Sequence, residues 1–492
     1  MTDWPMTFKC NNNCISCILD RKMTSDIPDP PLKQIKKIID SLDEEKDYFG
    51  ISGGEPTLRR ELFDVIKYLR EKKPNIYTFM VSNGRMFAYR DYTKKFSELP
   101  LGDFMVGITL YGSTPEIHDK ITMAKGSFEQ TVKGIKNLLD FNIRVEVRTI
   151  ISKMNYKDME NLAKFVTENF KGIERFVFVN MKITGNAYKN RDKLIIKYTD
   201  LIPYVEKATD ILLNAGIKTR LYHFPLCMLD AKYIDFATGV TKELEELKFA
   251  PQCESCKLKE ECPMIWKTYA FFVGTDEFKP IGDEYLFFYY IQKLIRIYQK
   301  YETEESSKRL KFIEEMCKKY DVYAMLIGST AFKQCGKKSN IDIILLGNSK
   351  NMEMFKDEIK KHYDIDVHNE FDLNNILNTL KFDLNDKEYN NNIKRLLYLI
   401  FSYETSFTIG SKNIIDLINE IKSKLKKSDF WKEHFFEEFK IFLKTIDIKE
   451  LTNLDKKYFN RSKISDNDIK NIKYIENKLK KLQIIKNVIG DN

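Results

Sequence analysis

The sequence predicts an α/β protein that begins with an open, partial barrel of six parallel strands, a (β/α)6 arrangement. Over residues 5–225, short runs of strand-forming residues alternate with longer stretches of helical period, as in repeated strand–helix units of a parallel sheet. Six units are too few for a closed eight-stranded barrel, so the sheet is expected to stay open. Beyond about residue 270 the alternation ends, which predicts a second domain.

The expected strands of the first region are short and largely apolar. They are 6–9, 48–52, 76–82, 104–110, 144–151 and 175–181. Helical periodicity is found between them at 32–44, 58–72, 128–140 and 156–169. Active sites of such sheets lie at the carboxyl ends of the strands. The residues that directly follow each strand are therefore the first candidates for chemistry.

We expect four segments, because 492 residues exceed what one hydrophobic core usually serves. A core at 1–220 is followed by a cysteine-rich extension at 221–270, a smaller α/β domain at 285–380 and a helical region at 381–492. The smaller domain shows a strand, a Gly-Ser turn and a second strand over 322–347, then a strand at 365–367. Everything after about 385 is expected to be helical.

Composition predicts a cytoplasmic globular protein without a membrane partner. Hydrophobic residues make up 43% of the chain, yet no stretch approaches the roughly 20 apolar residues of a membrane span, and no secretion signal opens the chain. The net charge of +9 is a small excess of 81 basic over 72 acidic residues. Nucleic acid is therefore not an expected partner, and the lysines near the C-terminus are interpreted as solvated helix faces.

Three cysteines near the N-terminus form the first candidate metal site. Clustered cysteines in a reducing cytosol indicate metal binding rather than disulfides, and Cys10, Cys14 and Cys17 are spaced C-x3-C-x2-C. Clusters are normally held by four thiolates, so three would leave one iron of a 4Fe-4S cluster open to an exogenous ligand. Part of a zinc site is the alternative.

A glycine motif follows the second predicted strand. In Gly53-Gly54-Glu55-Pro56 the two glycines let backbone approach a ligand closely. With the cysteine motif one strand–helix unit earlier, it resembles the radical SAM superfamily of S-adenosylmethionine (SAM) enzymes. The resemblance implies a catalytic 4Fe-4S cluster on the three cysteines and SAM on its open iron. It also implies reductive cleavage of SAM to a 5′-deoxyadenosyl radical, with Gly53, Gly54 and Glu55 receiving the methionine amino group.

The resemblance extends to the ends of strands three to six, at positions Ser82, Asn83, Thr109, Arg148 and Gly185. It places Ser82 and Asn83 beside the ribose or methionyl part of SAM, Arg148 against its carboxylate and Gly185 beside adenine. Thr109 occupies a position on strand four that the family often fills with serine. The alternatives are a strand-end turn, a strand-forming threonine, a surface arginine and a simple turn. His118 is either a contact at the start of a helix or an active-site group.

A second cysteine cluster lies in the extension. Cys253, Cys256 and Cys262 are spaced C-x2-C-x5-C, and Cys227 supplies a fourth thiol from upstream. Four soft ligands suit zinc or a fully ligated 4Fe-4S cluster equally well. Downstream of such a core the pattern resembles the SPASM and twitch extensions, which implies one auxiliary 4Fe-4S cluster. The remaining Cys317 and Cys335 are interpreted as buried or incidental thiols.

Over a little more than half of the chain, the sequence resembles the radical SAM maturases of the His-Xaa-Ser system. The resemblance rests on the closing cysteines and on four stretches, 107–112, 124–128, 182–185 and 225–227. It implies a ribosomally made peptide as substrate. It also implies a partner maturase and an electron donor such as a flavodoxin or ferredoxin.

The smaller domain resembles the minimal nucleotidyltransferases. Gly328 and Ser329 would form the turn, and Asp342 and Asp366 would hold Mg²⁺ and a nucleoside triphosphate. Asn340 stands where the first carboxylate belongs, so we expect a fold retained for binding rather than a transferase. An unrelated α/β segment is the alternative.

Two other hypotheses for the whole chain remain. One is a nucleotidyltransferase or nucleotide-binding protein with a regulatory iron–sulfur domain. The other is a zinc-binding interaction protein without catalytic activity.

Overall fold

The computed structural model separates the chain into two units, Met1–Pro280 and Ile281–Asn492. It describes residues 3–24, 26–237, 244–299, 304–326, 341–379 and 465–482, together with 399, 407–409, 417, 420, 421 and 439. Among these described residues, no helix is both long enough and apolar enough to cross a membrane.

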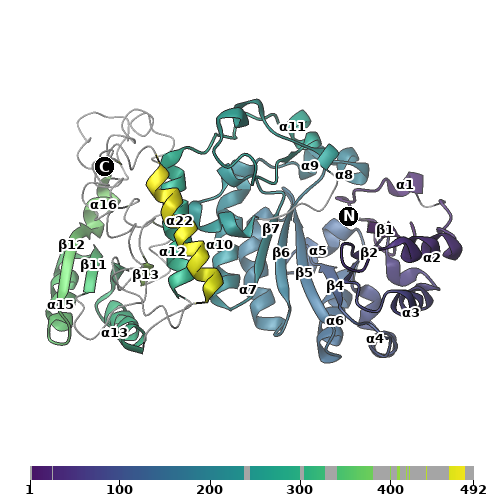
Figure 1. The fold of residues 1–492 in the computed structure, drawn as a ribbon, viewed down its shortest axis with the longest axis horizontal. Coiled ribbons are helices and arrows are strands. Elements are labelled where there is room, and N and C mark those ends of the chain that lie inside the picture. Colours follow the sequence, from purple (N-terminus) through teal and green to yellow (C-terminus); the bar gives the residue numbers. More distant parts are fainter. Residues whose placement is uncertain are drawn as a thin grey trace. The chain divides into compact units, whose positions relative to one another are not determined.

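The first unit is built on a seven-stranded parallel sheet, in which the strands lie in the order of the sequence (Figure 1). The strands are β1 (Asp3–Pro5), β2 (Phe49–Ser52), β3 (Thr78–Ser82), β4 (Phe104–Thr109), β5 (Arg144–Ile151), β6 (Arg175–Asn180) and β7 (Thr219–Tyr222). Because every neighbouring pair is parallel, all carboxyl ends meet at one edge. β1 and β7 are the two outer strands, so the sheet is open.

The prediction of six strands was wrong by one, and the first strand was misplaced. β7 has only four residues, Thr-Arg-Leu-Tyr, which are too few to show a clear strand pattern in the sequence. β1 lies at Asp3–Pro5 rather than at 6–9. A proline within a run argues against a strand, but an outer strand tolerates it because one side needs no partner.

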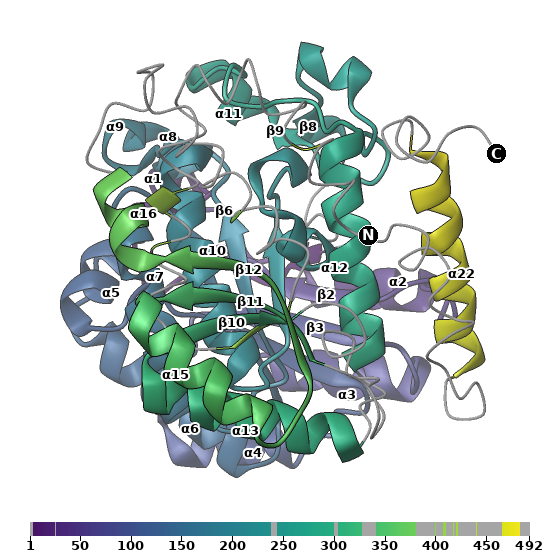
Figure 2. The same ribbon diagram turned by 90° about the vertical axis from the view of Figure 1, so that its left-hand side faces the viewer.

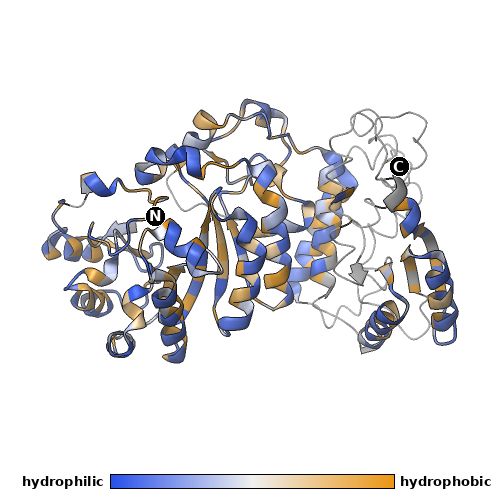
Figure 3. Cartoon of the chain, turned by 180° about the vertical axis from the view of Figure 1, so that it is seen from behind, coloured by the Kyte–Doolittle hydropathy of each residue, from blue (hydrophilic) through white to orange (hydrophobic). Residues whose placement is uncertain are grey.

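Seven helices of eight or more residues connect the strands. They are α2 (Leu32–Ser41), α3 (Leu62–Lys72), α4 (Arg90–Ser97), α5 (Pro115–Thr122), α6 (Ser127–Asp140), α7 (Met159–Asn169) and α10 (Tyr198–Asn214). α6 buries Phe128, Thr131, Ile135 and Leu138, which are spaced by three or four residues and so share one face. Figure 3 shows the resulting mixture of apolar and polar faces on these helices. The four predicted helices agree with α2, α3, α6 and α7, whereas α4, α5 and α10 were missed.

Short helices lie at the carboxyl edge of the sheet, and two short strands and a helix form part of the cysteine-rich extension. α1 (Arg21–Thr24) follows the first cysteines, and α8 (Gly185–Lys189) and α9 (Arg191–Leu194) follow β6. In the extension, β8 (Leu247–Lys248) pairs antiparallel with β9 (Ile265–Trp266). This pairing closes the loop that carries Cys253, Cys256 and Cys262, and α11 (Lys267–Phe272) begins directly after it.

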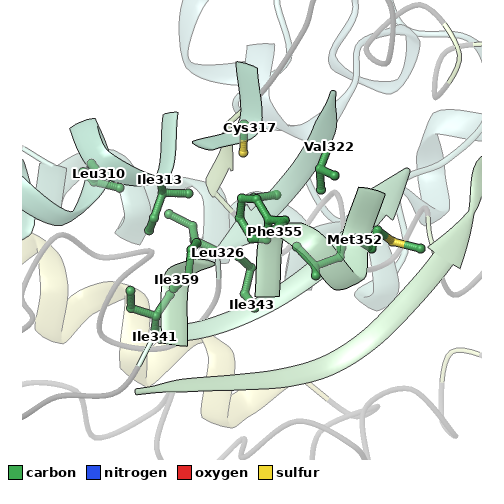
Figure 4. Close-up of a cluster of buried hydrophobic side chains, with 12 residues drawn as sticks. Leu310, Ile313, Cys317, Val322, Leu326, Ile341, Ile343, Met352, Phe355 and Ile359 are labelled. Carbon is green, nitrogen blue, oxygen red and sulfur yellow. The ribbon is translucent and has the colours of Figure 1, made fainter. Parts of the chain in front are cut away.

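The second unit contains a four-stranded mixed sheet, seen in Figure 2. Its order is β12 (Ile365–Asp372), β11 (Ile341–Gly347), β10 (Val322–Leu326) and β13 (Phe407–Ile409), with only β11 and β12 parallel. α13 (Glu304–Tyr320) and α15 (Ser349–Lys360) pack on it through the apolar cluster of Figure 4. Cys317 lies in this cluster and is 2% exposed, as predicted for a buried thiol. Other helices are α12 (Asp283–Gln299), α16 (Leu373–Thr379) and α22 (Asp466–Lys481).

The prediction that everything after 385 is helical was wrong, because β13 pairs with β10. Three residues are too few to show strand periodicity in the sequence. Gly328, Ser329, Cys335 and Asn340 lie outside the described residues. Asp342 and Asp366 occupy paired positions on the parallel strands β11 and β12. The nucleotidyltransferase-like domain therefore stays a prediction.

Candidate active site

The cysteine loop, residues 10–17, begins shortly after β1 and carries three half-buried thiols. Burial raises the pKa of Cys10 to about 11. Burial, together with the neighbouring Cys17 and Cys10, raises the pKa of Cys14 to about 12. Because this environment disfavours thiolates, the three thiols are protonated near neutrality without a metal. A bound cation would reverse that balance, and its binding would release protons.

The two glycines of the second motif pack directly against the backbone that leads into the cysteine loop. The Gly54 N–H donates to the Thr7 carbonyl at 2.6 Å, and the Glu55 N–H donates to the Lys9 carbonyl at 2.7 Å. A Cβ atom on Gly54 would overlap the Lys9 carbonyl oxygen, and one on Gly53 would overlap that of Thr7. The close approach seen here is therefore to the chain's own backbone. Contact of Gly53 and Gly54 with SAM stays a prediction.

Glu55 is completely buried, and its carboxylate joins the ends of β2 and β3. It accepts hydrogen bonds from the Thr57 N–H at 3.1 Å and the Thr57 hydroxyl at 2.6 Å. Two more come from the Ser82 hydroxyl at 2.8 Å and the Asn83 N–H at 2.7 Å. Burial raises the pKa of Glu55, and these four donors oppose the rise. Glu55 and Ser82, which were both predicted site residues, are thus hydrogen-bonded to each other.

Residues after β3 hold the start of the cysteine loop. The Asn83 side-chain amide donates to Asn11 Oδ1 at 2.6 Å and lies 3.9 Å from Cys10 Sγ. Arg85 donates to Asn12 Oδ1 at 2.8 Å and also to the Asn11 carbonyl. Neither Arg85 nor Asn11 was among the predicted site residues. The position of Arg85 just after the end of the predicted strand 76–82 is a sequence feature that could have identified it.

Residues after β6 hold the other side of the same loop. The Asn186 side-chain amide donates to the Cys14 carbonyl at 3.1 Å, and its N–H donates to the Leu19 carbonyl at 3.1 Å. The Ala187 N–H donates to the Cys17 carbonyl at 3.0 Å. Gly185 has φ +57°, and a Cβ there would overlap the Ile18 backbone. Sequence reasoning found Gly185 but missed Asn186 beside it.

Tyr111 and His118 support the cysteine loop from α5 and the end of β4. A hydrogen bond from the Tyr111 hydroxyl opposes the rise in the pKa of Cys14. His118 is 1% exposed, and its Nδ1 accepts from the Tyr111 N–H at 3.2 Å. Its ring packs on those of Tyr111 and Phe128, with 5.8 Å between centroids in both pairs. Of the two roles expected for His118, the structure therefore shows the packing contact.

Arg148 and Thr109 lie side by side on β5 and β4. Arg148 is not the surface residue of the alternative interpretation, because its side chain is 12% exposed and pairs with the buried Glu146 at 2.6 Å. Arg175 binds the other carboxylate oxygen of Glu146 at 2.5 Å. The pairing of Arg148 with the SAM carboxylate stays a prediction, as do the roles of Thr109 and Gly185.

The four thiols of the second cluster are gathered in the extension. Burial raises the pKa of Cys227, and the nearby Cys262, Cys253 and Cys256 add to the rise, which brings it to about 12. Within the described ranges, no three His, Cys, Asp or Glu side chains already have the arrangement of metal ligands. Cysteine thiols are suitable ligands for an iron–sulfur cluster and for zinc.

The comparison with protein families identifies the N-terminal region. Residues 4–166 match the family model described as "Radical SAM superfamily". The N-terminal third of the chain is therefore similar to the radical SAM superfamily. The matched residues include the cysteine loop, the Gly-Gly-Glu motif and Arg148. It ends before Gly185 and before the second cysteine cluster.

Curated relatives are similar to parts of this chain. The chain is 28% identical over 227 residues to Fe-coproporphyrin III synthase of Methanosarcina barkeri, covering 45% of this chain and 53% of that protein. It is 28% identical over 176 residues to the cysteine-type anaerobic sulfatase-maturating enzyme of Clostridium novyi, covering 33% and 46%. The chain spans about half the length of these curated relatives. Among solved structures, Streptococcus suis SuiB bound to precursor peptide SuiA matches at 18% identity and a TM-score of 0.37, covering 44% of this chain and 47% of that one.

Proposed function

We propose that the chain is a radical SAM enzyme that cleaves SAM reductively to a 5′-deoxyadenosyl radical and uses it to modify a ribosomally made peptide. The match of residues 4–166 to the radical SAM family model supports the chemistry. The observation that carries the proposal is the double support of the cysteine loop. Asn83 and Arg85 hold it from β3, and Asn186 holds it from β6.

In this proposal Cys10, Cys14 and Cys17 bind three irons of a 4Fe-4S cluster. Such a cluster, when reduced, supplies the electron that breaks the sulfonium–carbon bond of SAM. The chain itself fixes positions rather than transferring protons, since misplacement by about 1 Å can cost roughly a hundredfold in rate. Glu55 acts through Asn83 on Cys10, and Asn186 acts on Cys14. Both are therefore positioning residues.

We further propose that Cys227, Cys253, Cys256 and Cys262 hold an auxiliary 4Fe-4S cluster. The supporting observations are that β8 and β9 close the loop of Cys253, Cys256 and Cys262, and that neighbouring thiols of this set raise the pKa of Cys227 and of Cys262. Zinc is the alternative metal for four thiolates. Metal analysis separates the two, because a zinc site would leave iron only at the first cluster.

The peptide substrate rests on the resemblance to His-Xaa-Ser maturases. It is also supported by the name of the sulfatase-maturating relative, which acts on a protein. The same resemblance proposes a partner maturase and a flavodoxin or ferredoxin as electron donor. The name of the Methanosarcina relative denotes an iron porphyrin product instead. A tetrapyrrole is therefore the second candidate substrate.

For the second unit we propose nucleotide binding without transfer. The paired register of Asp342 and Asp366 supports it, because it brings the two predicted carboxylate positions onto neighbouring strands. Mg²⁺ and a nucleoside triphosphate would be the ligands. Labelling by a nucleoside triphosphate that survives Cys10→Ala would instead support the nucleotidyltransferase hypothesis.

Anaerobic reconstitution tests the metal assignments. The proposal expects about eight irons per chain, and about four in either Cys14→Ala or Cys262→Ala. Cys317→Ala is the matched control, because this thiol lies in the apolar cluster of the second unit, and it should retain about eight. Zinc with no iron in the wild type would contradict the proposal.

A further inference from the structure

A pocket of about 700 Å³ lies between α8 and α11 in the first unit. Both helices are found at the same end of the unit in Figure 1. One wall carries Tyr188 and Lys189, and the other carries Lys267, Phe271 and Phe272. The volume is in the range of ligand-binding pockets.

Three aromatic rings line this pocket, and two of them are well exposed. Phe271 is 80% exposed and Tyr188 is 48% exposed. Phe272 connects them, with its ring centroid 4.9 Å from that of Phe271 and 5.7 Å from that of Tyr188. A contiguous exposed apolar surface with a polar rim is typical of an interaction site, and aromatic residues are common at the energetic centres of interfaces.

Positive charge surrounds the aromatic surface. Lys189 is neutralised by Asp20 at 2.5 Å. Lys267 forms no ion pair with any residue in the described part of the chain, and the Arg191 guanidinium lies over the rings of Tyr188 and Phe272. Three cations and one carboxylate leave an excess of positive charge. A carboxylate on the ligand would complement it.

The two walls are connected to the two cysteine clusters. Gly185 and Asn186 of α8 pack on the backbone of residues 14–19. The α11 wall begins at Lys267, five residues after Cys262. A molecule in the pocket would therefore contact segments that position both groups of thiols.

We propose that this pocket binds an acidic peptide segment, with an aromatic or aliphatic side chain on Phe271 and Phe272 and an adjacent carboxylate near Lys267. Neighbouring residues of an extended peptide are about 3.8 Å apart, so one short segment supplies both groups. The identification of this segment as part of the substrate rests on the proposed function. The binding itself does not.

The test is fluorescence anisotropy with a fluorescein-labelled peptide Gly-Ser-Phe-Glu-Phe-Glu-Ser-Gly and the full chain. Phe271→Ala should weaken binding about tenfold or more, and Lys267→Ala about threefold. Tyr89→Ala and Lys95→Ala are the matched controls, because both side chains are exposed on or beside α4. Replacing both glutamates of the peptide by glutamine should remove the difference between wild type and Lys267→Ala.

Reversing the charge at Lys267 gives a more specific test. Lys267→Glu should weaken binding of the glutamate peptide and strengthen binding of a peptide with lysine at both glutamate positions. Equal binding of the glutamate, glutamine and lysine peptides would overturn the proposal, as would no binding or effects equal to those of the controls. Displacement of the peptide by haemin that depends equally on Phe271 but not on Lys267 would assign the pocket to a tetrapyrrole and also overturn it.

Binding and catalysis can fail separately. The anisotropy experiment needs neither reductant nor SAM. If the peptide binds as described but SAM stays intact after reduction, the proposed function fails and the acidic-peptide pocket stands. If SAM is cleaved but Phe271→Ala and Lys267→Ala bind the peptide like the wild type, the pocket proposal fails alone.

Discussion

The backbone N–H of Asn83 donates a 2.7 Å hydrogen bond to the buried carboxylate of Glu55. The side chain of the same Asn83 donates to Asn11, beside Cys10. The Gly-Gly-Glu motif is thereby connected to the first thiol by two successive hydrogen bonds. This connection gives the motif a structural task in addition to the contact with SAM that the resemblance implies.

Glu55→Gln is expected to weaken this connection. Glutamine has the same shape as glutamate. Its side-chain NH2 group cannot accept a hydrogen bond, however, and would face some of the N–H and O–H donors that now bind the Glu55 carboxylate. Leaving one buried donor unsatisfied costs about 1–3 kcal/mol of unfolding free energy, and the Cys10 end of the loop should bind iron less tightly. Urea unfolding and iron analysis after reconstitution measure both effects. Glu129→Gln, at an exposed position on α6, should behave like the wild type, and identical results for the two variants would contradict this role of Glu55.

Gly54→Ala is expected to displace the backbone that leads into the cysteine loop. The new Cβ would overlap the Lys9 carbonyl oxygen, whereas a Cβ on Gly347 would have its nearest neighbour at 3.4 Å. Overpacking of this kind typically costs about 1–3 kcal/mol. Thermal unfolding should show a lower Tm for Gly54→Ala than for Gly347→Ala. Equal Tm values would show that the two backbones can move apart without penalty.

Asn186→Ala is expected to loosen the Cys14 side of the loop without unfolding the protein. The variant loses hydrogen bonds to the Cys14 carbonyl and from the Arg21 N–H. Loss of outer-shell support typically lowers metal affinity about tenfold or more. The rate of iron removal by a chelator is the measurement. Asn169→Ala is the matched control, because the Asn169 side chain bonds only to the Phe165 carbonyl and Lys136 among the described residues. A rate equal to that of the control would exclude a positioning role for Asn186.

His118 should make the first unit sensitive to acid. Burial lowers the pKa of His118 to about 4 from an ordinary value of 6.5. The folded state therefore binds its proton less readily than the unfolded state, so this stabilisation is complete above about pH 6.5 and is lost as the pH falls towards 4. Between pH 7.5 and 5 the loss is about 2 kcal/mol.

Urea titrations at these two pH values test the prediction. His118→Gln should lose about 2 kcal/mol less stability than the wild type over this interval. His362→Gln, at an exposed position, should lose as much as the wild type. The same loss in all three proteins would contradict the role of His118.

Local patterns were sufficient to predict much of the sheet. The strands 48–52 and 104–110 are largely apolar runs, and 144–151 alternates apolar with polar residues, which is also typical of a strand. β7 was missed because its four residues are too few to show either pattern clearly. β1 was misplaced because Pro5 argues against a strand except at an edge.

The support of the cysteine loop could not be predicted in the same way. Asn83 and Asn11 are 72 residues apart, and Asn186 and Cys14 are 172 apart. Only the parallel arrangement of the strands brings these residues to one edge. Likewise, nothing in the spacing of Arg148 and Glu146 distinguishes a buried ion pair from two solvated side chains, because burial depends on the neighbouring strands.

The most direct test of the central claim is the quantity of 5′-deoxyadenosine formed from SAM by the anaerobically reconstituted protein after reduction with dithionite. The account predicts formation in the wild type that requires reductant and is abolished in Cys14→Ala, while Cys317→Ala forms as much as the wild type. Intact SAM in the reduced, iron-loaded wild type, or equal 5′-deoxyadenosine from Cys14→Ala, would contradict it.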